Sequence, residues 1–88
     1  MNIIIYTQNS CVFCDAAKHQ FKKRNWEYTE YNLSDDENKV SLFERFPNAK
    51  TVPQIWIDDE HIGGFDELMA HLKGTKFIYG ESWGQNIA

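Results

Sequence analysis

The sequence predicts a single α/β domain in which helices flank a four-stranded mixed sheet, in the order βαβαββα. Three observations carry this prediction. A β-branched run opens the chain, apolar residues at helical spacing recur in three later stretches, and a tight-turn signal separates two short apolar runs. The chain has 88 residues, and 42% of them are hydrophobic, which is enough for one modest core.

The first third of the chain predicts a βαβ unit. Residues 2–7 form an apolar, β-branched run, which favours a strand. Helical spacing of apolar and small residues follows over 12–24 and ends at Asn25. Residues 26–33 are rich in aromatic side chains, so we expect a second strand there.

A second helix is expected next. Residues 34–37 combine an N-cap candidate with an acidic first turn, and Pro47 marks the end of the helix. The apolar face of this helix is predicted to consist of Val40, Leu42, Phe43 and Phe46.

A hairpin and a last helix complete the predicted domain. The two strands, 54–57 and 60–62, flank Asp58-Asp59, which is a candidate tight turn. The helix is expected over 65–73, with Gly74 as its stop. Its inward-facing residues are predicted to be Leu68, Met69 and Leu72.

We expect residues 1–74 to form the domain and residues 75–88 to be a C-terminal extension of unknown role. The extension carries the aromatic residues Phe77, Tyr79 and Trp83, which would suit a sheet edge or a partner contact. Packing or disorder is the favoured interpretation of this segment, in preference to a function.

Charge and cysteine usage limit the classes of partner and compartment. The net charge is −4, and Lys22-Lys23-Arg24 is the one basic cluster, so nucleic acid is not an expected partner. Neither a signal peptide nor a membrane span is recognised in the sequence. A single close cysteine pair, in place of a disulfide framework, predicts a reducing, cytoplasmic location.

The motif Cys11-Val12-Phe13-Cys14 is interpreted as a redox dithiol. It follows a predicted strand and opens a predicted helix, where free N–H groups stabilise a thiolate on the first cysteine. The same motif is half of a zinc site, but zinc needs about four N or S ligands. Completing such a site would require His61 and His71, whose spacing is unlike that of a zinc finger.

Two further motifs are weaker when taken alone. Thr51-Val52-Pro53 precedes a predicted strand, and the proline favours an extended Val52 whose main chain could pair with a peptide. Its alternative is an ordinary loop. Gly63-Gly64-Phe65-Asp66 would present N–H groups to a carboxylate, while Asp66 could bind an ammonium group. The alternative there is a glycine turn with an aspartate N-cap.

Together these motifs resemble a dithiol glutaredoxin. The resemblance covers residues 2 to about 73, and it implies a thioredoxin-like fold with glutathione as the reducing co-substrate. Its motifs are Tyr6-Thr7-Gln8, Cys11-Val12-Phe13-Cys14, Thr51-Val52-Pro53-Gln54 and His61-Ile62-Gly63-Gly64-Phe65-Asp66.

The resemblance also implies roles for individual residues. Pro53 would be a cis proline facing the active site, and Val52 would pair with the cysteinyl backbone of glutathione. The γ-glutamyl end would be held by Gly64, Phe65 and Asp66. The complete predicted site has the catalytic residues Cys11 and Cys14 and the glutathione-binding residues Gln8, Phe13, Thr51, Val52, Pro53, Gly64, Phe65 and Asp66.

Two departures from the family pattern bear on the chemistry. The family often has a lysine at the position of Gln8, so a missing cation would have to come from Lys39, Arg45 or Lys50, among which the sequence does not choose. Val12-Phe13 replaces the common Pro-Tyr pair. Some relatives without that proline hold a [2Fe-2S] cluster between two chains, an alternative that remains open although no metal is expected.

The predicted function is a glutathione-dependent oxidoreductase for protein disulfides and glutathione mixed disulfides, an electron-transport role. Cys11 would be the nucleophile and Cys14 the resolving thiol. The expected partners are glutathione and client proteins, ribonucleotide reductase among the candidates, and the expected state is a monomer. One rival is a ribonucleotide-reductase-type redoxin reduced by thioredoxin reductase, although such proteins lack the Gly-Gly-x-Asp pocket. The other is a dimeric cluster-binding glutaredoxin.

Overall fold

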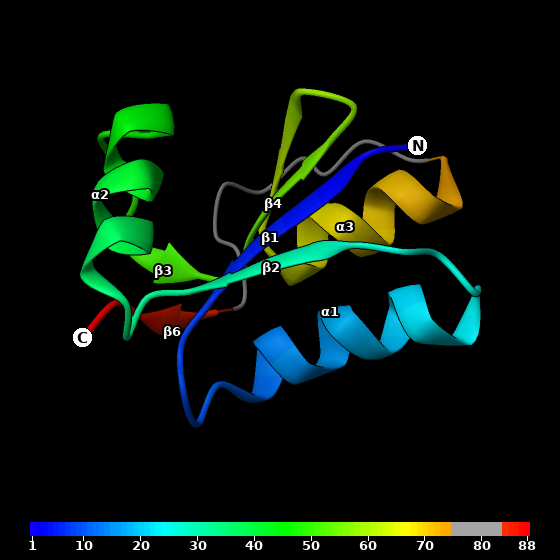
Figure 1. Ribbon diagram of the computed structural model, residues 1–88. Coiled ribbons are helices and arrows are strands. Elements are labelled where there is room, and N and C mark those ends of the chain that lie inside the picture. Colours follow the sequence, from blue (N-terminus) through cyan, green and yellow to red (C-terminus); the bar gives the residue numbers. More distant parts are fainter. Residues whose placement is uncertain (75–83) are drawn as a thin grey trace.

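The main sheet of the computed structural model has four strands in the order β2-β1-β4-β5, and the structure describes residues 1–74 and 84–88. The central strand β1 is parallel to β2 and antiparallel to β4, and β4 continues antiparallel into β5. The sheet is therefore mixed, as predicted (Figure 1). The strand bounds are β1 Ile3–Thr7, β2 Thr29–Asn32, β4 Gln54–Ile57 and β5 Glu60–Gly63.

Within residues 1–74 and 84–88, three helices cover the two faces of this sheet. They are α1 (Val12–Lys23), α2 (Asp36–Arg45) and α3 (Phe65–Lys73). In Figure 1, α1 and α3 lie together along the sheet, and α2 stands apart from them at its other end. The order of elements through α3 follows the predicted βαβαββα, with one additional two-residue strand, β3, before β4.

The alternation of side chains along β1 divides the core into two clusters. All five residues of β1 are buried, which explains why the strand opens with three consecutive isoleucines. One cluster joins Ile3 and Ile5 to α1 and α3, and the other joins Ile4 and Tyr6 to α2 and both cysteines. The α1 and α3 members of the first cluster are Ala17, Phe21 and Leu68.

The predicted apolar face of α2 is wrong in part. Leu42 is fully buried, and Phe46 packs against the same cluster four residues later. Val40 is 57% exposed and Phe43 is 36% exposed. Val40 lies two residues before Leu42, which is about 200° around a helix, so the two side chains cannot face the same core.

Turn and cap residues set the boundaries close to those predicted. Asp58 and Asp59 both have positive φ, 50° and 66°, as a two-residue hairpin turn requires. Gly74 ends α3 in the left-handed conformation, with φ 73°. Asp35 caps α2 by accepting a hydrogen bond from the Glu37 N–H at 2.9 Å. The second strand is shorter than predicted and occupies Thr29–Asn32.

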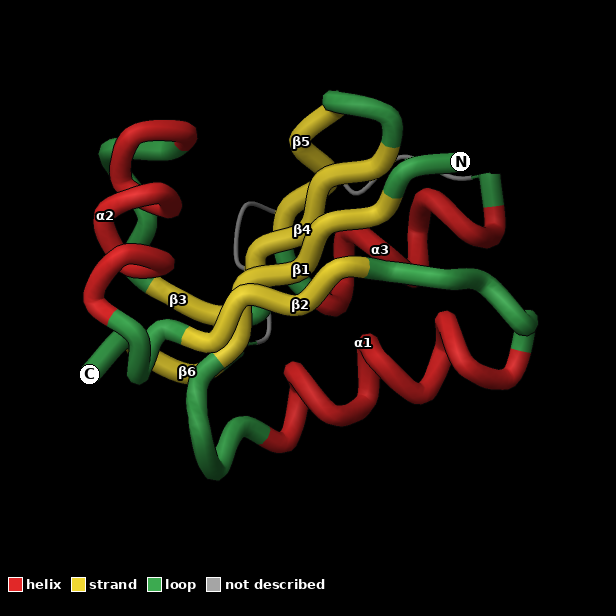
Figure 2. Tube along the Cα trace, viewed as in Figure 1, coloured by secondary structure: helices red, strands yellow, loops and turns green. Residues whose placement is uncertain are grey.

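A second, two-stranded sheet joins distant parts of the chain. The strand β3 (Thr51–Val52) pairs antiparallel with β6 (Gln85–Asn86). The two strands lie side by side at one end of the molecule, near α2 (Figure 2). The last residues of the predicted extension therefore pack on the domain, whereas Phe77, Tyr79 and Trp83 fall outside the described residues.

Across residues 1–74 and 84–88, none of the helices has both the length and the apolar character that a membrane span requires.

Candidate active site

The two cysteines lie at the N-terminus of α1 and form a disulfide with each other. Cys11 is the N-cap residue and Cys14 lies in the first turn, with 5.2 Å between their Cα atoms. The Cys14 N–H points at the Cys11 sulfur at 3.1 Å. When the pair is reduced, this N–H and the positive end of the helix favour a thiolate on Cys11.

The two cysteines are buried to the same extent. Cys11 is 2% exposed and Cys14 is 1% exposed. The chemical asymmetry between them therefore comes from their positions relative to the helix start. Val12 is the exposed residue of the motif, at 74%, and it presents an apolar surface next to the disulfide.

The Val52-Pro53 segment lies directly against the dithiol. The peptide bond between the two residues is cis, as the resemblance implied, and both residues are fully buried. The Val52 carbonyl oxygen is 3.9 Å from the Cys11 sulfur. Val52 also belongs to the same core cluster as Cys11 and Cys14, so the segment and the dithiol form one packed unit.

The start of α3 provides a second group of predicted site residues. Gly64 is the N-cap, so the alternative in which Asp66 caps the helix is wrong. The Phe65 ring packs against the Phe13 ring with centroids 5.9 Å apart, which joins the first turns of α1 and α3. A side chain at Gly63 would meet the Glu67 carboxylate at 2.7 Å, and its φ of 114° also favours glycine.

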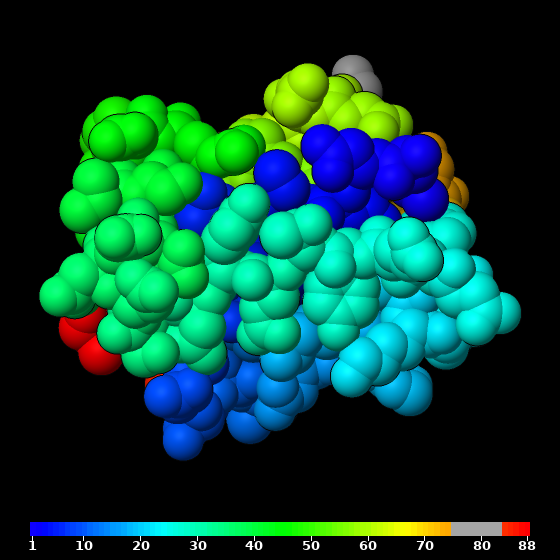
Figure 3. Space-filling model, viewed as in Figure 1, coloured from blue at the N-terminus to red at the C-terminus, as the bar shows by residue number. Residues whose placement is uncertain are grey.

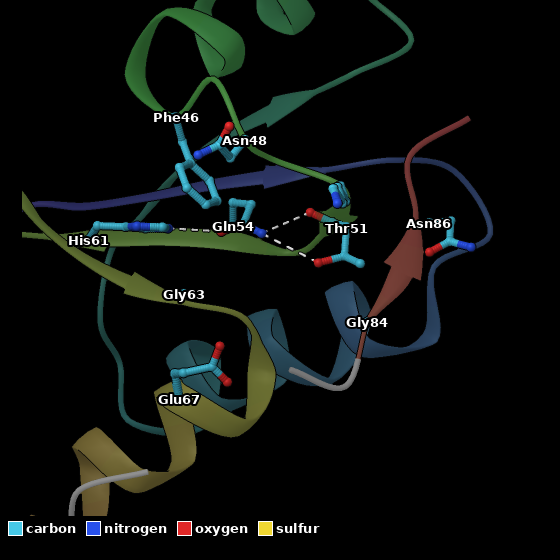
Figure 4. A pocket seen from close by; sticks show the side chains of 10 residues that line it. Phe46, Asn48, Thr51, Gln54, His61, Gly63, Glu67, Gly84 and Asn86 are labelled. Atoms are coloured by element: carbon cyan, nitrogen blue, oxygen red, sulfur yellow. Dashed lines mark hydrogen bonds between the residues drawn. The ribbon is translucent and has the colours of Figure 1, made fainter. Parts of the chain in front are cut away.

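Three polar residues that line a cavity of about 550 Å³ are joined by hydrogen bonds (Figure 4). The Gln54 side chain donates to the Thr51 carbonyl oxygen at 3.0 Å, and its amide oxygen lies 2.8 Å from His61 Nε2. Burial lowers the pKa of His61, and the negative charge of Glu67 offsets part of this shift. The cavity is lined by Phe46, Asn48, Lys50, Thr51, Gln54, His61, Gly63, Glu67, Gly84 and Asn86.

The α1 helix is anchored to the sheet through Glu30. This carboxylate accepts hydrogen bonds from the Thr7 hydroxyl at 2.7 Å and from Lys18 at 3.1 Å. Burial alone would raise the pKa of Glu30, but the hydrogen bonds from Thr7 and Lys18 outweigh it and lower the pKa. For Lys18, burial acts to lower the pKa, and the bond to Glu30 raises it overall.

Known proteins with similar sequences and structures point to one family. The family model named Glutaredoxin matches residues 3–62. A probable glutaredoxin of Synechocystis sp. is 39% identical over 69 residues, which are 77% of this chain and 78% of the relative. The crystal structure of glutaredoxin 1 from Francisella tularensis, complexed with cacodylate, superposes with a TM-score of 0.71 and 36% identity. That superposition covers 83% of this chain and 93% of the other.

The chain belongs to the glutaredoxin family. It therefore has a thioredoxin-like fold and is a thiol-disulfide oxidoreductase, with the Cys11–Cys14 disulfide as its CxxC-type centre. A second glutaredoxin structure, from buckwheat, was solved as a complex with glutathione. It has a TM-score of 0.68 and 26% identity, and the match covers 82% of this chain and 69% of the other.

The structure separates the predicted site of this glutaredoxin into two groups. The first group lies at the dithiol and comprises Cys11, Phe13, Cys14, Val52 and Pro53. The second lies at the start of α3 and comprises Gly64, Phe65 and Asp66, and the contact between the Phe13 and Phe65 rings joins the two groups. Among the described residues, no three histidine, cysteine, aspartate or glutamate side chains are grouped to hold a metal ion.

Gln8 lies outside both groups of site residues, because its side chain contacts Asn86 and Ala88. Its amide nitrogen donates to the Asn86 carbonyl oxygen at 2.9 Å, and its amide oxygen accepts from the Ala88 N–H at 3.1 Å. Sequence reasoning assigned Gln8 to glutathione and missed this contact. The two partners are 78 and 80 positions away, and nothing in residues 84–88 signals where they lie.

The three candidate cations occupy different surroundings. The Lys39 ammonium donates to the Ala88 carbonyl oxygen at 2.7 Å, so it binds the same segment as Gln8. Arg45 lies over the Trp56 ring, 5.7 Å from its centroid. Lys50 lines the cavity beside Thr51. Of the three candidates, Lys39 is thus the one whose side chain contacts Ala88, which Gln8 also contacts.

Proposed function

We propose that this chain is a glutathione-dependent oxidoreductase that reduces protein disulfides and glutathione mixed disulfides. The observation that carries the proposal is the Cys11–Cys14 disulfide at a helix N-terminus, packed against the buried Val52-Pro53 segment. The glutathione complex of the buckwheat relative supports the choice of co-substrate. Since such a dithiol must be reduced to act again, we also expect a cytoplasmic location.

The first half of the cycle transfers oxidation from the client to the dithiol. The Cys11 thiolate attacks one sulfur of the client disulfide, and the other client sulfur leaves as a thiolate. The Cys14 thiolate then attacks the Cys11 sulfur of this mixed disulfide. The Cys11–Cys14 disulfide forms, and the client leaves with its second sulfur reduced.

The second half restores the dithiol with two molecules of glutathione. A glutathione thiolate attacks the Cys11 sulfur, which releases the Cys14 thiolate and leaves glutathione bound to Cys11 through a disulfide. A second glutathione thiolate attacks the glutathione sulfur of that bond. Oxidised glutathione leaves, and Cys11 is again a thiolate stabilised by the helix N-terminus.

In this proposal glutathione lies along β3 between the starts of α1 and α3. Its γ-glutamyl end would be held by Gly64, Phe65 and Asp66, with the carboxylate at the helix start and the ammonium group at Asp66. Its cysteinyl backbone would pair with Val52, next to Thr51 and Pro53. Phe13 would cover the reacting sulfurs, and the glycyl end would lie toward Gln8.

A side-by-side turnover assay tests the proposal. The purified protein would reduce a small disulfide in two coupled systems, one with glutathione and glutathione reductase and one with thioredoxin reductase. We expect turnover in the glutathione system, and we expect Cys11→Ser to abolish it. Turnover sustained only by thioredoxin reductase would contradict the proposed co-substrate.

A further inference from the structure

The segment of residues 84–88, here called the strap, lies along the edge of β3. Its β6 portion pairs Gln85 with Val52 and Asn86 with Thr51. One residue further on, the Ile87 N–H donates to the Lys50 carbonyl oxygen at 3.0 Å. In Figure 3 the end of the chain, coloured red, emerges at the surface beside the start of α2.

This register places Gln85 at the main-chain groups that glutathione would need. Residue pairs in an antiparallel ladder alternate between hydrogen-bonded and non-hydrogen-bonded types. Because Ile87 bonds to Lys50, the pair two positions away, Gln85 and Val52, is also of the hydrogen-bonded type. The N–H and carbonyl of Val52 face one edge of β3, and the strap covers that edge.

The strap fits this edge closely. A Cβ atom at Gly84 would lie 2.6 Å from the Val52 carbonyl oxygen, so only glycine allows the present approach. That same oxygen is 3.9 Å from the Cys11 sulfur. The Ile87 side chain packs against the core cluster that contains both cysteines.

Side chains from two other elements hold the far end of the strap. Gln8 makes two hydrogen bonds to it, at the Asn86 carbonyl oxygen and the Ala88 N–H. Lys39 donates to the Ala88 carbonyl oxygen. In the proposed glutathione pose, Gln8 would meet the glycyl end of the tripeptide. The strap thus takes the place of both the cysteinyl backbone and the glycyl end.

We propose that the edge of β3 is a binding surface for a single extended peptide, that the strap occupies it as an internal competitor, and that glutathione must displace the strap to pair with Val52. The proposal rests on the glutathione dependence proposed above. Its consequence is thermodynamic, because the apparent affinity equals the intrinsic affinity multiplied by the fraction of molecules whose edge is open. If the strap covers the edge about nine-tenths of the time, its release strengthens binding about tenfold.

The probe for this competition is S-methylglutathione, a thioether that cannot exchange with the Cys11–Cys14 disulfide. Titrations followed by NMR would give its Kd for the parent, Gly84→Val and Ile87→Ala. The first substitution blocks the close approach to Val52, and the second removes an apolar contact of the strap while leaving every proposed glutathione-binding residue unchanged. Asn86→Ala is the matched control, since its side chain is exposed and its part in the strap is played by the main chain.

We expect both strap substitutions to lower the Kd several-fold and Asn86→Ala to keep the parent value. In the parent, saturating probe should accelerate hydrogen exchange at the Ile87 amide, because its bond to Lys50 is broken. Equal Kd values with Ile87 still protected would overturn the competition while leaving glutathione binding intact. If the probe binds none of the four proteins, the proposed co-substrate fails, and the competition fails with it.

Discussion

The dithiol and the edge of β3 meet at Val52, but they are assembled from very different stretches of the chain. Cys11 and Cys14 are three positions apart, and one helix start fixes their geometry. The edge of β3 is covered by a strand that begins 33 positions after Val52, at Gln85. A local motif can be predicted from its spacing, whereas a contact this distant depends on the packing of the whole domain.

The two regions should also respond differently to change. The dithiol forms covalent bonds, so losing one sulfur removes a chemical step. The edge forms main-chain hydrogen bonds and a few side-chain contacts, each with a modest net contribution of about 0.5–1.5 kcal/mol. Substitutions at the dithiol are therefore expected to act on turnover, and substitutions around the edge on binding.

The largest effect is expected at the cysteines. Cys11→Ser should lower the reduction of both protein disulfides and glutathione mixed disulfides by at least about a hundredfold, because the attacking thiolate is lost. Cys14→Ser should keep the reduction of a glutathionylated peptide, which needs one thiol only. Parallel assays on the two substrates would check this. A Cys14→Ser protein that cannot reduce the glutathionylated peptide would rule out the one-thiol route.

A smaller effect is expected at Asp66, which would bind the γ-glutamyl end of glutathione. Asp66→Ala should raise the KM for glutathione, because one charge-assisted contact contributes at most about 1.5–3 kcal/mol. The KM for a small disulfide should change less. Asp36→Ala is the matched control, since it removes the same charge from the first turn of another helix. Equal KM values for Asp66→Ala and the parent would remove Asp66 from the glutathione site.

Gln8→Lys should have a modest effect that links the two regions. A lysine can still donate to the Asn86 carbonyl oxygen but cannot accept from the Ala88 N–H, so the hold on the strap weakens. Its charge should also lower the pKa of the Cys11 thiol slightly, since position 8 is partly exposed and solvent screens a charge there. Thiolate absorbance in a Cys14→Ser background would measure this. The shift should shrink as salt is raised, and a higher pKa at low salt would contradict it.

The smallest effect is expected at Glu30, which connects α1 to the sheet, and it concerns the pH dependence of stability. Because hydrogen bonds lower the pKa of Glu30 in the folded state, its contribution to stability is present above its ordinary pKa of 4.5 and is lost as the pH falls below it. Urea unfolding from about pH 6 to about pH 3 should show a steeper loss of stability in the parent than in Glu30→Gln. Glu44→Gln, at an exposed position on α2, should follow the parent. Identical slopes for all three proteins would mean that Glu30 contributes nothing.

The elements of the main sheet were predictable because their signals are local. Three consecutive isoleucines marked the buried central strand, Asp58-Asp59 marked the hairpin turn, and Gly74 marked the end of α3. The face of α2 was predicted less well. Val40 and Phe43 are apolar, but the helix contacts the core along a narrow stripe that includes Leu42.

The site was predictable to a similar degree. The dithiol and the cis peptide bond before Pro53 agree with what the motifs indicated, whereas the contact between Phe13 and Phe65 was not predicted. The partners of Gln8 did not follow from the sequence. Main-chain hydrogen bonds use N–H and carbonyl groups that nearly every residue has. The identities of Gln85 and Asn86 therefore do not indicate that these residues pair with β3.

The most direct test of the account is the structure in solution of the Cys14→Ser protein carrying glutathione as a mixed disulfide on Cys11. NMR contacts between the cysteinyl residue of glutathione and Val52 would show which strand occupies the edge. The account predicts such contacts, together with loss of the pairing between Val52 and Gln85. Persistent contacts between Val52 and Gln85, with none to the bound glutathione, would contradict it.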